Sequence, residues 1–478
     1  MTRTLRASIL VWLAATLVSG LAFFFGTGLA PIPWLGWLAA APVLALAFER
    51  PGSGAWLAAF AAFFLGGCTW VAFLGKVTPW PILLVGLAVP SLVFALGVAL
   101  AGRAARRLGS WPALIALPAL WVSFELASSR LSPHGTSLSL AYTQAEVPPV
   151  ARLAALTGLA GISFLLLLVP SGLALAFRER HRPRRAVALL GVTALGMALA
   201  LAAAGWAASG PPEPTVRVGL AAADPAVPFF ATENRAEALA VVARFEPQIA
   251  ALAAQGARVV LLPEKLTGIA PAYEDEVFAR FSAAARASQV YLVVGLNRIG
   301  RPQRLNSALV FGPDGRLLLD YTKRYLLPGF ETGYAVGEVP GFFELDGRKV
   351  GVMICKDLDF PLWARRYSQA GARLVLAPAW DFVADGPLHA HMGQMRAIEQ
   401  GFSLARSAQE GLLAAWDDRL RHRHETPTAA APDVSLVVDL PLGRGPTLYS
   451  RWGDWLAWSS VVASLVLLAA SWRRRQEG

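Results

Sequence analysis

The sequence predicts a polytopic α-helical membrane domain, about eight spans in all, joined to a layered α/β globular domain. Long apolar runs with almost no internal charge fill residues 1–207, and a further run fills 453–472. Residues 208–452 have an ordinary globular composition and alternate strand-like with helix-like patterns. The mean hydropathy of +0.48 is therefore an average over two chemically different parts.

Eight apolar runs have roughly the 17–25 residues that a bilayer crossing needs. They are residues 7–25, 31–48, 54–74, 80–101, 111–128, 157–177, 186–207 and 453–472. The second and the fifth are short and bordered by proline, a residue that ends helices. Arg3 and Arg6 precede the first run as in a signal peptide. That run is too long and others follow it, which indicates an uncleaved first helix.

The charge of the loops predicts how the chain crosses the membrane. Arginines gather at the N-terminus, in the loops near 49–53, 102–110 and 178–185, and in the C-terminal tail. The alternate short loops carry only Lys76, Arg130 and Arg152. Because cytoplasmic loops are enriched in Lys and Arg, we expect both termini in the cytoplasm and the globular domain outside it.

The net charge of +11 does not indicate nucleic-acid binding. Residues 208–452 contain 26 Lys and Arg against 26 Asp and Glu, so the globular domain is neutral. The whole excess lies in the membrane parts. There the segment 178–185, RERHRPRR, is a topology determinant and a candidate contact for anionic lipid. The predicted partner is thus a membrane, with no nucleic acid.

The two cysteines restrict the chemistry of the globular domain. Cys68 falls in the third apolar run, which leaves Cys355 alone between 208 and 452 and excludes a disulfide framework there. An unpaired thiol outside the cytoplasm is vulnerable to oxidation unless it is buried or used in chemistry. Cys355 is therefore either a core residue or a nucleophile.

Periodicity predicts the elements of the globular domain. Strands are expected at 215–223, 257–264, 290–299, 372–380 and 434–440, hairpins at 306–323 and 342–355, and helices at 232–255, 273–288 and 389–402. The stiff, proline-rich segment 208–214 suits a linker after the seventh span.

Three polar side chains stand where predicted strands end. Glu264 ends VVLLPE, Lys323 ends LLLDYTK and Cys355 ends VGVMIC. Catalytic groups of α/β sheets gather outside the carboxyl ends of strands. A carboxylate can take a thiol proton, a thiolate can attack a carbonyl, and an ammonium can stabilise the oxyanion. Each residue also has a structural explanation, as a helix cap, a solvated hairpin end and a core residue, and spacing alone does not decide.

Three segments resemble, in order, the signature blocks of the nitrilase, or carbon–nitrogen hydrolase, superfamily. They are LLPEKLTG, YTKRYLLPG and ICKDLDFP. The segments HGTSLSLAYTQ, HAHMGQMRAIEQGFSLARSAQEG and TLYSRWGDW, on this arrangement of spans, are similar to one branch, the apolipoprotein N-acyltransferases. The resemblance implies an αββα sandwich with Glu264 as general base, Lys323 as oxyanion stabiliser and Cys355 as nucleophile. Glu331 falls near the family's second active-site glutamate.

The family implies a two-step reaction at the bacterial cytoplasmic (inner) membrane. The cysteine takes an acyl chain from a phospholipid, and the N-terminal amine of a diacylglyceryl-cysteine lipoprotein then attacks the thioester. The expected domains are a membrane domain of seven helices (1–207), an extracytoplasmic catalytic domain (208–452), and a last helix with a cytoplasmic tail (453–478). We expect a monomer that needs no cofactor.

Some positions depart from the family's usual pattern. Lys356 and Asp357 stand where an aromatic residue and Glu usually follow the nucleophile, and APAWDF keeps Trp380 but loses a polar pair. These changes near the nucleophile candidate leave open a second hypothesis, a divergent paralogue that acylates another amine acceptor. A membrane-tethered amidase is a further alternative, because CKDLDFP also resembles soluble members of the superfamily.

Two other classes of function have weaker support. A non-catalytic scaffold or transporter is disfavoured because the spans lack paired charges beyond Glu125. The pairs His389/His391 and His422/His424 suggest a metal, but no acidic or thiol ligands accompany them at a suitable spacing, so none is predicted.

Overall fold

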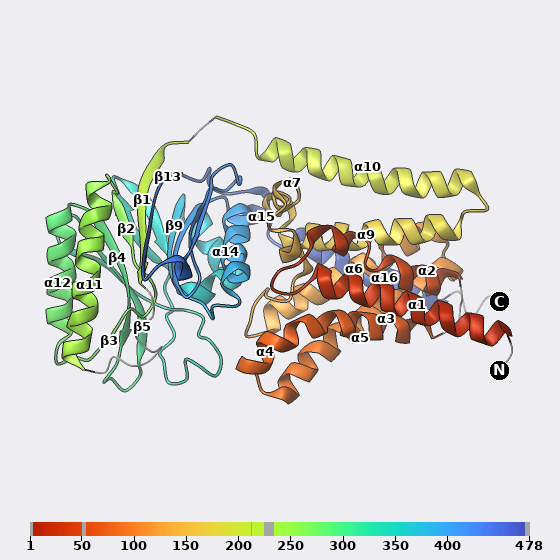
Figure 1. The fold of residues 1–478 in the computed structure, drawn as a ribbon. Helices are drawn as coiled ribbons and strands as arrows, with labels where there is room; N and C mark the ends of the chain where they lie inside the picture. Colours follow the sequence, from red (N-terminus) through yellow and green to blue (C-terminus); the bar gives the residue numbers. More distant parts are fainter. Residues whose placement is uncertain (1–2, 50–53, 212, 224–233, 474–478) are drawn as a thin grey trace. The chain divides into compact units, whose positions relative to one another are not determined.

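A computed structural model describes residues 3–49, 54–211, 213–223 and 234–473 (Figure 1). Its internal contacts divide the chain into two compact units. The first comprises Met1–Ser132, Leu138–Ala207 and Trp452–Gly478, and the second comprises Pro133–Ser137 and Ala208–Arg451. The short segment Pro133–Ser137 is thus part of the second unit, although it interrupts the sequence of the first. The predicted tail beyond residue 473 lies outside the described residues.

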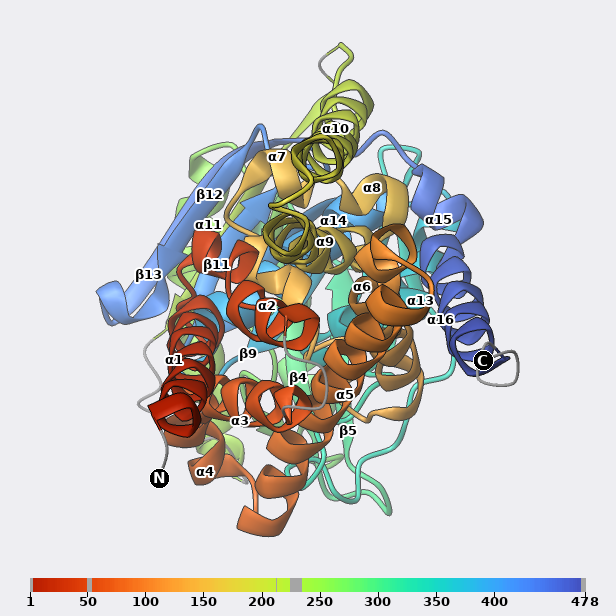
Figure 2. The same cartoon turned by 90° about the vertical axis from the view of Figure 1, so that its right-hand side faces the viewer.

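The first unit is helical (Figure 2). Its main helices are α1 (Arg3–Gly26), α2 (Ala41–Glu49), α3 (Ala55–Gly67), α4 (Val71–Val77), α5 (Trp80–Arg107), α6 (Ser110–Leu131), α9 (Leu159–Arg178), α10 (Pro183–Ala207) and α16 (Trp455–Arg473). Helix α1 packs on α3, α3 on α5, and α5 on α6, which also contacts α9 and α16. Long apolar side chains remain on the outside, including Leu10, Ile82, Val187 and Leu199, each at least 61% exposed. Such a surface suits lipid and not water.

Seven helices among the described residues are long and apolar enough to cross a membrane. They are Ile9–Gly26, Ala55–Val77, Trp80–Arg107, Ser110–Leu131, Leu159–Arg178, Pro183–Ala207 and Trp455–Trp472. The predicted span over 31–48 differs. It forms a short 3-10 turn, Pro33–Trp37, and the nine-residue helix α2. Nine residues rise only about 14 Å, against a hydrocarbon core of about 30 Å. The described residues before 208 thus contain six helices of membrane length and the shorter apolar helix Pro33–Glu49, where a second crossing stays a prediction.

The second unit contains two sheets. The seven-stranded sheet has the order β13 (Asp433–Pro441), β1 (Thr215–Ala223), β2 (Val259–Leu261), β4 (Tyr291–Arg298), β5 (Leu305–Phe311) and β6 (Leu317–Thr322), with β3 (Gly268–Ile269) paired to β4. The six-stranded sheet has the order β12 (Arg423–Pro427), β11 (Leu412–Trp416), β10 (Ser403–Gln409), β9 (Leu374–Trp380), β8 (Arg348–Val352) and β7 (Gly341–Leu345).

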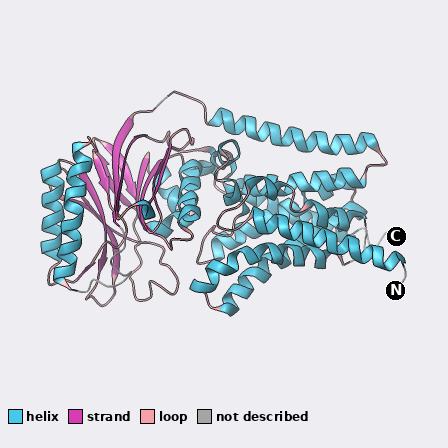
Figure 3. Ribbon diagram, viewed as in Figure 1, coloured by secondary structure: helices cyan, strands magenta, loops and turns pink. Residues whose placement is uncertain are grey.

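Helices cover both outer faces of these sheets (Figure 3). On one side lie α11 (Arg235–Ala254) and α12 (Glu274–Ser288), and on the other α13 (Pro361–Gln369) and α14 (Gly386–Gln400). Along β2, Leu261 joins the core between the sheets, and Val260 joins the core under α11 and α12. A strand buried on both faces reads as an unbroken apolar run, which explains the segment ARVVLLPE. The predicted αββα architecture is confirmed.

The order of the strands brings four chain segments to one edge. Strand β2 is parallel to β4, and β8 is parallel to β9. The two sheets meet beyond these strands, where Glu264 N donates to Ala379 O at 3.2 Å. The residues that follow β2, β6, β8 and β9 are therefore close neighbours, as the rule for carboxyl ends of strands predicts.

Gly295 allows this close approach, which generates a prediction. A Cβ on Gly295 would lie 2.4 Å from Pro263 O and 2.6 Å from Glu264 Cα. We expect Gly295→Ala to displace Glu264 and to lower the free energy of unfolding by about 1–3 kcal/mol, as overpacking does. The measurement is the thermal midpoint in detergent. The control is Gly191→Ala in α10, where a Cβ meets nothing within 4 Å. Equal midpoints for both variants would contradict this role.

Candidate active site

Cys355 begins a tight turn at the exit of β8. The 3-10 turn η4 spans Cys355–Asp359, and Cys355 itself has a φ of +46°. Lys265, which follows Glu264, has a φ of +50°. Left-handed backbone is strained for residues other than glycine, and such strain gathers at functional sites. The Cys355 side chain is buried at 7% exposure, with Sγ 3.5 Å from Trp380 O.

Asp357 holds the turn that begins at Cys355 in this conformation. Its Oδ2 accepts hydrogen bonds from Ile354 N at 2.9 Å and from the Tyr321 hydroxyl at 2.7 Å. Its Oδ1 accepts from Arg324 N at 3.1 Å and Tyr325 N at 2.8 Å. The carboxylate therefore joins the cysteine turn to the segment that follows β6.

Glu264 and Lys323 form a buried ion pair beside the turn. Lys323 Nζ lies 2.8 Å from Glu264 Oε1, and both side chains are 3% exposed. Asn306 Nδ2 donates to Glu264 Oε1 and to Glu331 Oε1, each at 2.6 Å. Burial alone disfavours the ammonium, but Glu264 and then Glu331 outweigh it and raise the pKa of Lys323 well above its usual value. Lys323 is therefore a permanent cation.

Glu331 is fixed by two lysines. Its carboxylate lies 3.1 Å from Lys323 Nζ and 2.6 Å from Lys265 Nζ, and it accepts from Leu327 N at 2.7 Å. Burial favours the neutral acid, yet Lys323 and then Lys265 lower the pKa of Glu331 to about 2. Glu331 is thus a carboxylate at every working pH and is brought next to Lys323, near the position the sequence indicated.

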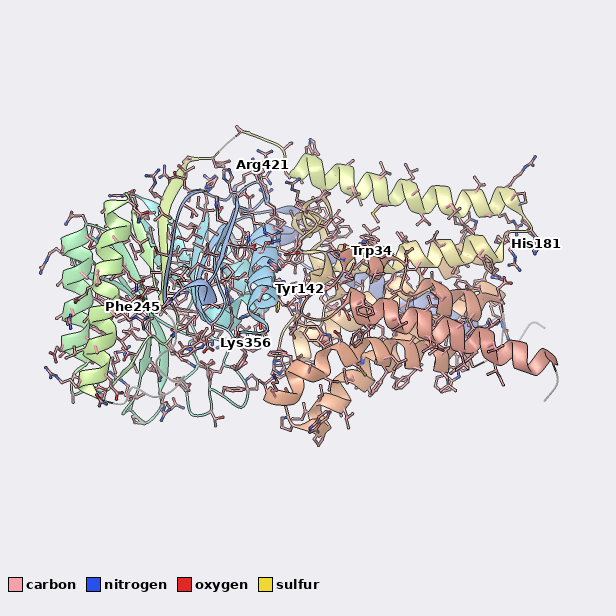
Figure 4. The ribbon with its side chains drawn as sticks, in the orientation of Figure 1. Trp34, Tyr142, His181, Phe245, Lys356 and Arg421 are labelled. Atoms are coloured by element: carbon pink, nitrogen blue, oxygen red, sulfur yellow. The ribbon has the colours of Figure 1, made fainter. Side chains whose placement is uncertain are left out.

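Lys356 and Trp380 complete the set of residues singled out by sequence. Lys356, labelled in Figure 4, is buried, with Nζ 3.2 Å from Asp359 Oδ2 and 3.4 Å from His134 Nδ1. These contacts direct the ammonium into the protein and not towards solvent. Trp380 ends β9 and donates from Nε1 to Glu410 Oε2 at 3.1 Å.

Sequence reasoning missed a second group of polar residues next to the thiol. Asp381 follows β9, Arg406 lies in β10 and His389 lies in the first turn of α14. Arg406 Nη1 donates to Asp381 Oδ2 at 2.9 Å, while His389 contacts Asp381 and Asp359. The segment APAWDF offered a signal, because its aspartate directly follows a buried strand. The sequence analysis had weighed His389 only as a metal ligand and rejected it because no acidic or thiol ligand stood nearby in sequence, whereas the structure brings Asp381 and Cys355 next to it.

The surroundings of the thiol act on it in opposite directions. Burial raises the pKa of Cys355, and the charge of Glu264 raises it further. Lys323 and His389 lower it. One ligand atom each of Cys355, Asp381 and His389 lies within 4.8 Å of the others. Both ring nitrogens of His389 already face carboxylates, so this group does not fit a metal ion.

Comparison with known proteins assigns the class. A family model described as Carbon-nitrogen hydrolase matches residues 217–450. Omega-amidase NIT2 of Xenopus tropicalis is 31% identical over 188 residues, which cover 34% of this chain and 68% of that protein. An amidase of the nitrilase superfamily from Nesterenkonia AN1 superposes with a TM-score of 0.41 at 23% identity, covering 48% of this chain and 92% of that one. The family model and the similarity to omega-amidase NIT2 show that the chain belongs to the carbon–nitrogen hydrolase superfamily.

The remaining part of the chain identifies the family within this class. The model described as Apolipoprotein N-acyltransferase N-terminal domain matches residues 19–172. An apolipoprotein N-acyltransferase of Geobacter metallireducens is 27% identical over 503 residues, which cover 95% of this chain and 93% of that protein. The chain belongs to the apolipoprotein N-acyltransferase family, as its sequence motifs indicated.

The four hydrogen bonds of Asp357 lead to a prediction. Asp357→Asn keeps the size but turns one acceptor oxygen into a donor, so two of the four donors lose their partner. A buried unsatisfied donor costs about 1–3 kcal/mol, and we expect a lower thermal midpoint together with slower alkylation of Cys355. The matched control is Asp439→Asn, an exposed residue paired with Arg217, whose loss should change little. A variant of Asp357 as stable and as reactive as the wild type would contradict the role.

Proposed function

We propose that this protein is an N-acyltransferase that moves a fatty acyl chain from a phospholipid to the N-terminal amine of a diacylglyceryl-cysteine lipoprotein. One observation carries the proposal. A buried cysteine beside a Glu–Lys ion pair stands in a chain that is similar to an apolipoprotein N-acyltransferase along 95% of its length. The similarity includes the helical unit, which an amidase acting on soluble amides does not need.

In the first step, Glu264 accepts the proton of the Cys355 thiol, and the sulfur attacks the ester carbonyl of the phospholipid. Lys323 stabilises the oxyanion of the tetrahedral intermediate. The C–O bond then breaks and Glu264 returns the proton to the leaving hydroxyl of the lysophospholipid. The product is a thioester on Cys355. The ion pair of 2.8 Å between Glu264 and Lys323 supports these roles, because it places the base and the cation together.

In the second step, the lipoprotein amine attacks the thioester carbonyl. Glu264 takes a proton from the amine, Lys323 again stabilises the oxyanion, and the C–S bond breaks to release the thiolate and the amide. Glu331 acts by holding Lys323 and Lys265, and Asn306 orients both glutamates. Asp357 and Lys356 support the turn that presents the thiol, and Trp380 lies beside it.

The membrane unit accounts for the choice of substrates. Both the donor and the modified terminus of the acceptor reside in a bilayer, so the catalytic domain must work at its surface. We propose that the protein resides in the bacterial cytoplasmic membrane, with both termini in the cytoplasm and residues 208–452 outside it. This orientation takes the shorter apolar helix Pro33–Glu49 as the second of seven crossings before residue 208. The arginines in the loops support this orientation. A monomer holds all the proposed catalytic residues.

The acyl-enzyme provides the first test. Purified protein incubated with a phospholipid should gain the mass of one acyl chain, and peptide mapping should place it on Cys355. Cys355→Ala should trap none, and Glu264→Gln should form the adduct about 10²–10⁴-fold more slowly, the usual loss of a general base. Cys68→Ala, the control, should behave as the wild type, since Cys68 lies in the helical unit, where its thiol donates to Phe64 O at 3.4 Å. Equal trapping by Cys355→Ala would contradict the mechanism.

The acceptor provides the second test. A synthetic peptide with an N-terminal diacylglyceryl-cysteine, added with phospholipid, should be recovered with an amide-linked acyl chain. The same peptide with an acetylated amine is the control and should remain unchanged. Release of free fatty acid or cleavage of amides without N-acylated peptide would instead favour an amidase.

A further inference from the structure

His389 projects from the first turn of α14 between two carboxylates. Its Nδ1 lies 2.8 Å from Asp381 Oδ1, and its Nε2 lies 3.1 Å from Asp359 Oδ1. A ring nitrogen this close to a carboxylate oxygen carries a hydrogen, because two acceptors repel each other. Both nitrogens of His389 are therefore donors, and the ring is an imidazolium.

Each of the two carboxylates is held by another cation. Arg406 pairs with Asp381, and Lys356 Nζ lies 3.2 Å from Asp359 Oδ2. Arg406 Nη2 also lies 3.1 Å from His389 Nδ1, because both donate to the same oxygen of Asp381. Burial opposes the charge on the ring, but Asp359 outweighs it and raises the pKa of His389 well above its usual value. Lys356 and then His389 hold the pKa of Asp359 at about 2 despite its burial.

The balance of charge differs between the two sides of the thiol. Beside Glu264, the two carboxylates are matched by two lysines, Lys323 and Lys265. Beside His389, the carboxylates of Asp359 and Asp381 are already matched by Lys356 and Arg406. The imidazolium adds one positive charge that this group does not neutralise. The Cys355 sulfur lies within 4.8 Å of a ligand atom of this group.

The other titratable groups that face this cluster are peripheral. Asp385, half-buried at the start of α14, accepts from Phe382 N at 2.9 Å, and burial raises its pKa. His134 lies 3.4 Å from Lys356 Nζ, and burial lowers its pKa, so it adds no competing charge. Arg406 faces the thiol as well, but its guanidinium is paired with Asp381.

We propose that His389 is a second cationic partner of the Cys355 sulfur, which stabilises the thiolate both when it attacks the donor and when it leaves the thioester. The inference rests on the proposed role of Cys355 as nucleophile. His389 keeps its two protons throughout. The thiol proton moves to Glu264 in the first step, and the sulfur departs with the electron pair of the C–S bond in the second, facing the imidazolium each time. Lys323 stabilises the carbonyl oxygen, so the two cations serve different atoms.

The test measures the thiol without any lipid. The rate of alkylation of Cys355 by iodoacetamide is followed against pH in wild type and in His389→Gln, which is neutral but retains hydrogen bonding. Loss of a cation this close to the sulfur should raise the pH at which alkylation reaches half of its maximum rate by about 1–3 units. The control is His391→Gln, two residues further along α14, whose Nε2 faces Glu425 at 3.5 Å and which should keep the wild-type profile. An unchanged profile in folded His389→Gln overturns the inference.

Two further measurements separate the possible failures. His389→Lys restores a positive charge, and it should recover part of the shift if charge, and not shape, is what the thiol requires. In wild type, ¹⁵N NMR of the six histidines should show one ring that keeps both protons well above the pH at which a free imidazole loses one. A spectrum in which no ring does so overturns the inference even if the variants do not fold. Alkylation needs no acyl donor, so failure of the acyl-enzyme test alone contradicts the proposed function and not the role of His389.

Discussion

The candidate active site depends on the burial of many charges at the edge where two sheets meet. Removing an ion from water costs several kcal/mol, and only close partners repay it. Lys323 therefore has to lie against Glu264 and Glu331, and Arg406 against Asp381. Removal of one partner leaves an uncompensated charge in the interior, which couples the stability of this domain to the integrity of its site. The proposed chemistry uses the same ions that the fold must pair.

This arrangement is rigid before any substrate arrives. The strained backbone at Cys355 persists because Asp357 fixes the turn to the segment after β6 with four hydrogen bonds. Charges that are fixed in advance need no reorganisation when an oxyanion or a thiolate forms. The thiol itself is buried among apolar core residues between the sheets, which raises its pKa, and the cations Lys323 and His389 oppose that rise.

The two positions that depart from the family's usual pattern have clear places here. Lys356 neutralises Asp359, which in turn holds His389. Asp357 replaces a longer acid and reaches the backbone of both neighbouring segments. Both residues thus act through the turn and the imidazole that surround Cys355. The experiment with the diacylglyceryl-cysteine peptide tests which amine acceptor the protein uses.

The sequence by itself determined the architecture and the three residues at the strand ends. These are local features of the chain, which a sequence pattern can show. They are the apolar runs of membrane length, the unbroken apolar stretches of buried strands, and the acid, lysine and cysteine that follow those strands. The run at 31–48 is less regular than its apolar composition suggests, because proline and a tight turn interrupt the helix. Only the tertiary structure decided the pairing of charges. Lys265, Asn306, Asp381, His389 and Arg406 come from separate elements, and the order of strands in the two sheets brings them together. Which carboxylate meets which cation, and hence which ring is charged, depends on distances of about 3 Å that no local pattern encodes.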